Sequence, residues 1–531
     1  MNICMIVHNN GTRDGRVMRE AHTLRAAGHT VTVIGIPESG EAKPEEQLQD
    51  GVRVLRVDWY AEARRRFRRS GVPRALLFGA ICAAAVYGLY RLARWFFSAA
   101  IAPAAGTIEG LINAASFPWI IAALVVTLLG LYVVWRLLLA IKAALTRRAV
   151  ERDRTRRRMI SGEVADCSGF PAIRSRIPYW IPDWVLEIGL EPLGWLGAGT
   201  ARFSFQRYRS EELAAAAIRL KPDVVHCHDC IALPTGWLVK KALGIPLVYD
   251  AHEIYEAVAT RRPGATDYFA RVHHKYLPRI DGFIAVNDSA ANFYRCAYPA
   301  APRAVVIRNA LSPAVLGPYD GRLHRAAGLP ASEKILIYQG GYTKLRGLPV
   351  LVRAGALLPK GWSLVMMGSG ALEEELQAVA CEGEHPAKVH FIPAVPAAEL
   401  LSWTQGATVG IVPYEDKVLN HWIATPNKLW EYPSAGVPMI VQPFYEMRRI
   451  VEAFGCGWVL PETFTPSAIA GVVASLTEER LAEAREGCRH FIETDNWSSI
   501  YQGRLLRLYE ALEAQIAAKR TFVVTTASAR A

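Results

Sequence analysis

The sequence predicts an α/β protein with two doubly wound units and an apolar helical hairpin inserted in the first. Residues 2–8 form a short apolar run typical of a buried strand, followed by a glycine loop, a helix pattern and a second strand at 30–36. The same alternation starts again near Lys334, where an apolar run leads into a glycine turn. Two long apolar runs interrupt the pattern between these points.

Composition narrows the possible partners. A chain of 531 residues has room for two or three domains, and its formal net charge of +12 favours an anionic partner: nucleic acid, an anionic membrane or a phosphorylated substrate. The nine cysteines have no spacing typical of a disulfide framework, so we expect a reducing compartment. The N-terminus begins directly with a strand pattern, and no secretory signal is visible.

The first glycine loop is a candidate ligand contact. In a doubly wound domain the loop after the first strand faces the ligand crevice, which makes Gly11 and Arg16 candidate contacts of this N-terminal loop. The alternative is that Gly11 only forms a turn.

Two apolar runs, 75–90 and 118–135, predict a transmembrane hairpin. Arginines cluster before the first run at 64–69 and after the second at 147–158, whereas the stretch between the runs is almost neutral. This distribution places both ends in the cytoplasm, with the arginines beside anionic headgroups. Alternatives are a buried helix pair, or a first run that is re-entrant or lies in the interface.

Strands resume after the hairpin at 222–229, 245–253, 282–287 and 304–311, with helices between them, including one at 213–220. Because strands of the same kind stand on both sides, the hairpin is an insertion within one α/β domain. The Trp- and Pro-rich stretch 177–196 fits a membrane surface, an acceptor groove or a packed loop equally well.

The stretch 424–441 carries the first set of candidate donor-site residues. It predicts a helix followed by a buried strand, with Asn427, Lys428 and Glu431 spaced so that the amide and the carboxylate share a face. Such a helix start can hold a diphosphate at its tip and ribose hydroxyls on the carboxylate. An ordinary amphipathic helix with a solvated polar face is the alternative.

The turn at 338–347 carries the second set. Gly340 and Gly341 allow the backbone to approach a ligand, and Lys344 and Arg346 add positive charge. A diphosphate leaving group needs amide donors and cations of this kind. The alternative is a solvated basic turn.

Histidines occur at two strand ends. The stretch 226–230, HCHDC, has a single CxxC pair without a distant second pair, so we expect no metal and place Asp229 beside the crevice. His252 stands at the end of the next strand, where it can donate a hydrogen bond to a sugar hydroxyl or a phosphate. A structural histidine is the alternative.

Taken together, these motifs resemble those of the family 4 glycosyltransferases of GT-B architecture. The features that match are NNGTRDGRVMREAHTLRAAGHTVTVIG, PDVVHCHD, DAHE, YQGGYTKLRG, the 368–370 GSG turn, PNKLWEYPSAGVP and the helix at Trp497. The resemblance covers most of the chain outside 62–209 and is to the bacterial surface-polysaccharide type. It implies two Rossmann-like domains facing a cleft, a closing helix that returns to the first domain, and hexosyltransferase-like, retaining transfer from a nucleotide sugar without a cofactor or an obligatory metal.

The resemblance also assigns roles to individual residues. It implies that Arg346 binds the diphosphate, that Glu431 binds the ribose, and that His252 is the catalytic-site histidine near the donor sugar. Two positions depart from the family pattern. Ile423 stands where the family often has the first Glu of an E-x7-E pair, so the missing contact would come from Asn420 or be absent. Gly341 replaces a family arginine, for which Lys344 would substitute.

The predicted domain organisation has seven parts. They are the first part of the N-terminal domain (1–61), the membrane hairpin with basic flanks (62–160), an aromatic and Pro-rich connection (161–209), the second, acceptor-side part of the N-terminal domain (210–318), the donor-binding domain (319–490), the closing helix (491–518) and a disordered tail (519–531).

The predicted protein is therefore a glycosyltransferase at the inner membrane, with its catalytic domains in the cytoplasm. Its expected partners are a nucleotide sugar, a lipid-linked or glycan acceptor and the anionic membrane. Nucleic acid is not expected, because the arginines flank apolar runs and no nucleic-acid module is recognisable. The alternatives are a nucleotide-sugar epimerase and a non-catalytic component of polysaccharide assembly, the latter favoured by Ile423 and Gly341.

Overall fold

The computed structural model describes residues 1–12, 14–37, 43–60, 87–88, 91, 156–161, 167, 201–257, 265–382 and 388–528. The chain divides into two compact units. The first unit holds both β-sheets and comprises Met1–Val57, Arg157–Arg176 and Ser210–Ala531; the second comprises Asp58–Arg156 and Ile177–Arg209.

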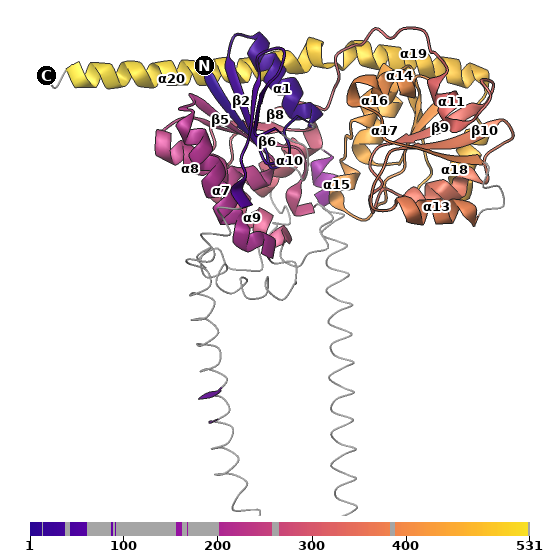
Figure 1. Cartoon of the computed structure of the whole chain (residues 1–531), viewed down its shortest axis with the longest axis horizontal. Coiled ribbons are helices and arrows are strands. Elements are labelled where there is room, and N and C mark those ends of the chain that lie inside the picture. Colours follow the sequence, from indigo (N-terminus) through magenta and orange to yellow (C-terminus); the bar gives the residue numbers. More distant parts are fainter. Residues whose placement is uncertain are drawn as a thin grey trace, which may run out of the picture. The chain divides into compact units, whose positions relative to one another are not determined.

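One eight-stranded sheet combines strands that precede residue 57 with strands that follow residue 223 (Figure 1). Its central strand β1 pairs in parallel with β2 and with β5, so Ile3 lies opposite both Val31 and Val224. All neighbouring strands are parallel except β3 and β4. In the order of the sheet the strands are β3 (Glu45–Gln47), β4 (Arg53–Arg56), β2 (Thr30–Gly35), β1 (Asn2–Ile6), β5 (Val224–His228), β6 (Leu247–Ala251), β7 (Gly282–Ala285) and β8 (Val305–Val306).

The second sheet has six strands, all parallel. Its central strands are buried throughout, as expected for a parallel sheet with helices on both faces. In order they are β11 (Val389–Ile392), β10 (Trp362–Met367), β9 (Lys334–Gln339), β12 (Val409–Val412), β13 (Met439–Val441) and β14 (Gly457–Val459).

Helices connect the parallel strands of both sheets (Figure 1). Those of the first sheet are α1 (Gly15–Ala26), α7 (Ala201–Arg219), α8 (Leu233–Leu243), α9 (Ala265–Tyr276) and α10 (Asp288–Ala297). Those that follow are α11 (Arg322–Ala327), α12 (Leu348–Gly355), α13 (Glu373–Cys381), α14 (Leu400–Thr404), α15 (Leu419–Trp422), α16 (Lys428–Ser434), α17 (Tyr445–Phe454), α18 (Pro466–Ala474) and α19 (Glu478–Thr494).

The C-terminal helical region packs against residues from both halves of the chain. A π-helical turn at Trp497–Tyr501 leads into α20 (Gln502–Ser528). The Trp497 indole Nε1 donates to the Thr23 hydroxyl at 3.0 Å, and the Trp430 indole Nε1 donates to the Asp495 carbonyl at 3.2 Å. This region therefore connects α1 of the first half with α16 of the second.

Two helix boundaries differ from the sequence predictions. Disorder was predicted from 519 onward, but α20 continues to Ser528, because alanine, lysine and arginine at 517–520 favour continued helix. The helix predicted at 213–220 begins earlier, at Ala201.

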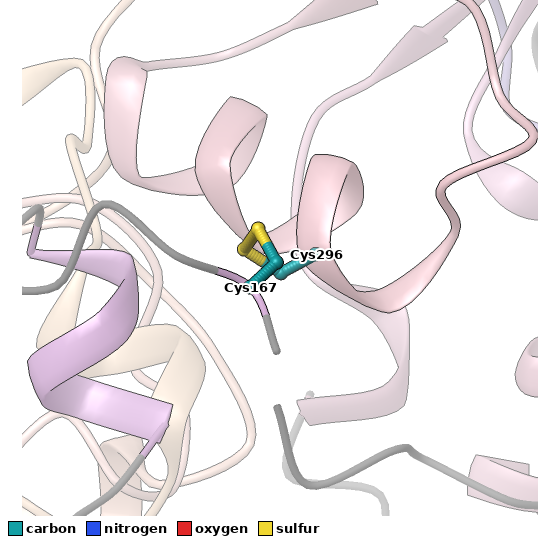
Figure 2. Close-up of a disulfide and its surroundings, with 2 residues drawn as sticks. All are labelled: Cys167 and Cys296. Carbon is teal, nitrogen blue, oxygen red and sulfur yellow. A yellow bond between two sulfur atoms is a disulfide. The ribbon is translucent and has the colours of Figure 1, made fainter. Parts of the chain in front are cut away.

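One disulfide joins Cys167 to Cys296 of α10 (Figure 2). The cysteine spacing had shown no disulfide framework, and the expectation of a reducing compartment rested on that. The two cysteines are 129 residues apart, so the pair depends on the tertiary structure and has no local spacing pattern. The other cysteines of the described part of the chain are free.

The predicted membrane hairpin (62–160) lies outside the described residues, except for Tyr87, Gly88, Arg91 and residues 156–160 of its C-terminal flank. Within the part of the chain that the structure describes, no helix combines the length and the apolar composition needed to cross a membrane.

Candidate functional site

His252 directly follows β6 and is held between two carboxylates. Its Nε2 lies 3.1 Å from Oδ2 of Asp250, and its Nδ1 lies 3.3 Å from Oδ1 of Asp229. Burial alone would lower the pKa of His252, but Asp229 and Asp250 outweigh it and raise that pKa to about 10. The ring is therefore an imidazolium at neutral pH, and it donates hydrogen bonds and carries positive charge.

Arg16 holds the Asp250 carboxylate that contacts His252. It lies in the first turn of α1 and is buried, and its Nε and Nη2 donate to the two carboxylate oxygens of Asp250 at 2.7 and 2.8 Å. Its Nη1 donates to the Ile307 carbonyl at 2.8 Å. Arg16 is thus a buried countercharge, whereas the sequence suggested a loop residue facing a ligand.

Gly11 forms the turn before α1. Its φ of 85° is in the left-handed region that favours glycine, and its N–H donates to the Asn9 side chain at 2.8 Å. Asn9 also donates to Asp14, which caps α1 by accepting from the N–H groups of Arg16 and Val17. The turn therefore fixes the start of the helix that carries Arg16.

A buried polar cluster lies beneath His252. Four of its side chains present possible metal ligands within 4.8 Å of one another: Glu20, His226, His228 and Asp250. The Arg16 guanidinium belongs to the same cluster, bonded to Asp250 and 3.5 Å from Glu20. Protein positive charge thus already neutralises Asp250, and the expectation of no metal stays a prediction.

Protonation also reduces the charge of this cluster. Burial, together with the neighbouring Asp250 carboxylate, raises the pKa of Glu20 to about 8 against the opposing effect of Arg16. Glu20 is therefore mainly a neutral carboxyl at pH 7. His226 accepts or donates through Nδ1 to the Tyr509 hydroxyl of α20 at 2.9 Å, so the C-terminal helix completes the cluster.

On the second sheet, the glycine turn after β9 interlocks with the turn after β10. Gly340 has a φ of 123°, and a Cβ built on Gly368 would lie 2.0 Å from the Gly340 carbonyl oxygen. The Tyr342 N–H donates to the Ser369 carbonyl at 2.9 Å. Only glycine fits at these positions, and Gly341 is exposed at the tip of the turn.

The cation that lies against the glycine turn is Lys428. A Cβ at Gly340 would come within 3.0 Å of the Lys428 Nζ, whereas Lys344, which the sequence offered as the substitute cation, is exposed. Burial lowers the pKa of Lys428 to about 8, and Glu431 only partly offsets this effect. An anion bound here would raise the pKa of Lys428 and keep the amine charged at higher pH.

Arg346 and Glu431 flank this position. The Arg346 guanidinium lies 4.1 Å from the centre of the Tyr414 ring, which fixes its plane. Glu431 Oε2 accepts from the Gln339 amide at 2.8 Å, and Asn427 is exposed at the start of α16. Four of the predicted donor-site residues, Gly340, Arg346, Lys428 and Glu431, are therefore neighbours, since Glu431 and Arg346 both influence the pKa of Lys428.

The first departure from the family pattern, Ile423, is the C-cap residue that ends α15, and Asn420 lies within that helix. Ile423 is buried, and its carbonyl accepts from the Asn287 side chain at 2.7 Å. Asn420, the suggested replacement for the missing Glu, uses its Oδ1 to accept the Ile254 N–H at 3.0 Å. This oxygen is therefore engaged in joining the second half to the turn after His252.

Glu253 is a residue that motif comparison did not single out. Burial and the nearby Asp229 raise its pKa, and Arg346 opposes that rise. Arg346 belongs to the glycine turn of the second sheet, so the two candidate turns influence each other electrostatically. The position of Glu253 beside the histidine in DAHE was the available signal, but the sequence did not indicate its partner.

Comparisons with known proteins agree with this architecture. The family model described as Glycosyltransferase Family 4 matches residues 169–315, and the model described as Glycosyl transferases group 1 matches residues 321–494. The D-inositol 3-phosphate glycosyltransferase 1 of Catenulispora acidiphila is 26% identical over 309 residues, which cover 54% of this chain and 72% of that protein. The corresponding enzyme of Thermobispora bispora is 26% identical over 312 residues, which cover 55% and 71%.

Solved structures support the fold. Sucrose-phosphate synthase from Thermosynechococcus elongatus superimposes with a TM-score of 0.60 at 13% identity, covering 98% of this chain and 100% of that one. A glycosyltransferase from Rickettsia africae gives a TM-score of 0.53 at 11% identity, covering 97% and 98%. The solved structures and the two parallel sheets show the GT-B fold. The two family models, which together match more than half of the chain, show that it belongs to the family 4 glycosyltransferases.

Proposed function

We propose that this chain is a membrane-associated glycosyltransferase that moves a hexose from a nucleotide sugar to a lipid-linked or polysaccharide acceptor, with retention of configuration. The observation that carries the proposal is the charged His252, held by Asp229 and Asp250. The next residue, Glu253, lies close enough to Arg346 for the arginine to oppose the rise of its pKa. The proposal includes no cofactor and no obligatory metal, because protein cations supply the positive charge that a leaving diphosphate requires.

The donor would be held mainly by the second half of the chain. Arg346 and Lys428 would neutralise the diphosphate, and the narrow turn at Gly340 would let it approach the backbone. Glu431 would accept hydrogen bonds from the ribose hydroxyls, while its Oε2 accepts from the Gln339 amide, which fixes the orientation of the carboxylate. In this arrangement the charge that builds up on the leaving group meets cations that are already in place.

His252 would act on the donor sugar or its phosphate as a hydrogen-bond donor. Since its pKa is raised to about 10, it is unsuited to accept a proton at neutral pH. Its role in the proposal is therefore to orient the sugar and to stabilise negative charge. Asp250 and Arg16 fix the ring and so reduce the reorganisation needed during the reaction.

Membrane association rests on the sequence of the insertion. Two apolar runs with arginines on both outer flanks favour a hairpin whose ends face the cytoplasm at the inner membrane. An insertion in the acceptor-side domain would hold that domain beside an anionic bilayer, where a lipid-linked acceptor is delivered.

The first experiment is nucleotide binding by the detergent-purified full chain, with UDP, GDP and ADP compared by calorimetry. We expect one nucleotide to bind, and Arg346→Ala and Glu431→Gln each to weaken it at least tenfold. Arg353→Ala and Glu375→Gln, which make the same changes on exposed residues of α12 and α13, are the controls. Absence of binding to all three nucleotides would refute the donor site and favour the non-catalytic alternative.

A second experiment tests the acceptor. Residues 64–150 are replaced by a short flexible linker, and transfer is measured with membrane vesicles and with a soluble glycan acceptor. We expect activity on vesicles to fall at least tenfold. Undiminished transfer with both acceptors would refute the lipid-linked acceptor and leave the glycosyltransferase assignment intact. Conversion of the nucleotide sugar without any acceptor would indicate the epimerase alternative.

A further inference from the structure

A short segment at the C-terminal end of the predicted membrane insertion belongs to the unit that contains both sheets. Residues 157–161, here called the return segment, are helical up to residue 160 and belong to the unit that contains both sheets. Met159 and Ile160 are buried, at 4% and 0% exposure. The return segment is thus part of the folded core.

Arg157 of the return segment contacts two residues in the second half of the chain. The Arg157 guanidinium donates to both carboxylate oxygens of Asp416, at 3.0 and 2.7 Å, and its carbon lies 4.8 Å from the centre of the Trp422 ring. Bidentate pairing together with stacking on an aromatic ring fixes both the position and the plane of a guanidinium. The Arg157 side chain is 19% exposed, so it is mostly withdrawn from the headgroups that the sequence assigned to the flanking arginines.

Two more contacts anchor the return segment to the same region. The Tyr445 hydroxyl of α17 donates to the Ser161 carbonyl at 2.6 Å. Ile160 belongs to the hydrophobic cluster that also contains Leu419 and Ile423, at the two ends of α15. The return segment therefore forms an ion pair with Asp416, three residues before α15, and places the Arg157 guanidinium over the Trp422 ring of α15.

Helix α15 in turn reaches the candidate site. Its Asn420 accepts the Ile254 N–H at 3.0 Å, and Ile254 lies two residues after His252. The chain of contacts thus runs from Arg157 through Trp422 and Asn420 to the turn that carries the histidine. Hydrogen bonds across 166 residues of sequence, such as Asn420 to Ile254, are what join the two halves at this point.

We infer that Arg157 is a positioning residue of the glycosyl-transfer site: by holding α15, it sets the turn at His252 and links the membrane insertion to the geometry of the reaction. This inference rests on the proposed function. The return segment follows the second apolar run in the sequence.

The test compares Arg157→Ala with Arg158→Ala in the full-length, detergent-purified chain. The two variants lose the same charge from adjacent positions, but residue 158 is exposed. We expect Arg157→Ala to lower kcat about tenfold, less than the roughly 100-fold that a misplacement of 1 Å can cost, because Arg157 acts on the site only through α15. The KM for the nucleotide sugar and the Kd of the nucleotide should change less than threefold, because Arg346 and Glu431 are untouched. Arg158→Ala should behave as wild type.

A charge exchange checks that the effect passes through the ion pair. Asp416→Arg alone should also reduce kcat, and Arg157→Asp combined with Asp416→Arg should recover part of the loss. Hydrogen exchange of the peptides 252–257 and 415–423 gives a readout that does not require activity: we expect faster exchange in Arg157→Ala in both peptides and no change in Arg158→Ala.

The outcomes separate the inference from the proposed function. If the wild-type chain neither binds a nucleotide nor transfers a sugar, the proposed function fails. If the wild type is active and Arg157→Ala retains its kcat and its exchange rates, the positioning role is wrong. A loss of kcat equal in the 157 and 158 variants would also overturn it, since net charge beside the membrane would then be responsible.

Discussion

The Asp250 carboxylate joins two residues that are far apart in the sequence: its Oδ2 lies 3.1 Å from Nε2 of His252 and accepts from Nε of Arg16 at 2.7 Å. Arg16 offsets the charge of the carboxylate, and the carboxylate still contacts His252. The carboxylate in turn keeps the histidine charged, with help from Asp229. A buried ion pair in the N-terminal half therefore determines the protonation of the residue that we place beside the donor sugar.

The charge of His252 predicts a pH dependence of stability. Its pKa in the folded chain is raised from 6.5 to about 10, so its stabilising contribution is complete below pH 6.5 and is lost as the pH rises toward 10. We expect His252→Asn to destabilise the chain most at pH 6 and progressively less up to pH 10, as measured by urea unfolding. A destabilisation that is constant over this range would contradict a charged ring.

His252→Asn should also lower kcat about 100-fold at pH 7, because it removes a preorganised positive charge from the site. The wild-type kcat should not rise with pH between 6 and 8, where an ordinary histidine would lose its proton. A wild-type kcat that rises with pH along an acidic limb near pH 6.5, with this limb absent in the variant, would show instead that the neutral ring is the active form.

Glu20→Gln should be well tolerated. Glu20 is fully buried and its pKa is raised from 4.5 to about 8, so at pH 7 glutamine resembles the form that is already present. We expect the free energy of unfolding at pH 5 to change by less than about 1.5 kcal/mol. The wild type should lose stability relative to the variant as the pH rises from 4.5 to 8, because only the unfolded chain gives up the proton easily.

The control for this prediction is Glu20→Ala, which removes buried volume as well as the carboxyl and should destabilise the chain at every pH. Urea unfolding at pH 5 and pH 8 measures both variants. Severe destabilisation by Glu20→Gln at pH 5 would mean that the ionised carboxylate is required, with Arg16 as its partner.

Lys428 predicts a pH dependence of nucleotide binding. Its pKa is about 8 in the unliganded chain, and a diphosphate binds best to the protonated amine. Nucleotide affinity should therefore fall by up to about tenfold between pH 7 and pH 9, as proton linkage requires. Lys428→Met should bind more weakly and lose this pH dependence, whereas Lys344→Met, on the exposed part of the glycine turn, should keep it.

Calorimetric titrations at three pH values test this prediction. Two results would contradict it. One is an equal loss of nucleotide affinity in Lys428→Met and Lys344→Met, which would mean that the exposed Lys344 also binds the diphosphate. The other is a wild-type affinity that does not vary with pH.

The disulfide predicts a pattern of thiol reactivity. Cys381 is exposed and free, whereas Cys167 and Cys296 are paired. Alkylation of the folded chain without a reductant should modify Cys381 and leave the other two unmodified until a reductant is added, as measured by peptide mass spectrometry. Cross-linking residues 129 apart should contribute about 5 kcal/mol through the entropy of the unfolded chain. Alkylation of Cys296 in the unreduced protein would rule the bond out.

Local sequence patterns determined most of the architecture. Apolar runs such as 2–8 and 362–367 became central parallel strands, because such runs are buried on both faces of the sheet. The glycine turn at Gly340 and the strand-end position of His252 were predictable for the same reason: both depend on short stretches whose backbone or periodicity is determined locally. The order of these motifs then identified the family.

Tertiary structure decided which charges meet. Arg16 and Asp250 are separated by 234 residues, and nothing near either indicates the other as its partner. Lys428, and not Lys344, lies against Gly340, because α16 brings its first residue to the turn after β9. Burial, which sets the pKa of such groups, is a property of the assembled sheets and helices.

The same reason explains the two features that the sequence missed entirely. Cys167 pairs with Cys296, although no spacing pattern in the sequence predicts a disulfide there. Arg157 forms an ion pair with Asp416, although the sequence placed this arginine in the basic flank of the membrane hairpin. A local pattern records what one segment buries or exposes, while an ion pair or a disulfide depends on the distance between two segments. That distance exists only in the folded chain, once the strands on both sides of the insertion have joined one sheet.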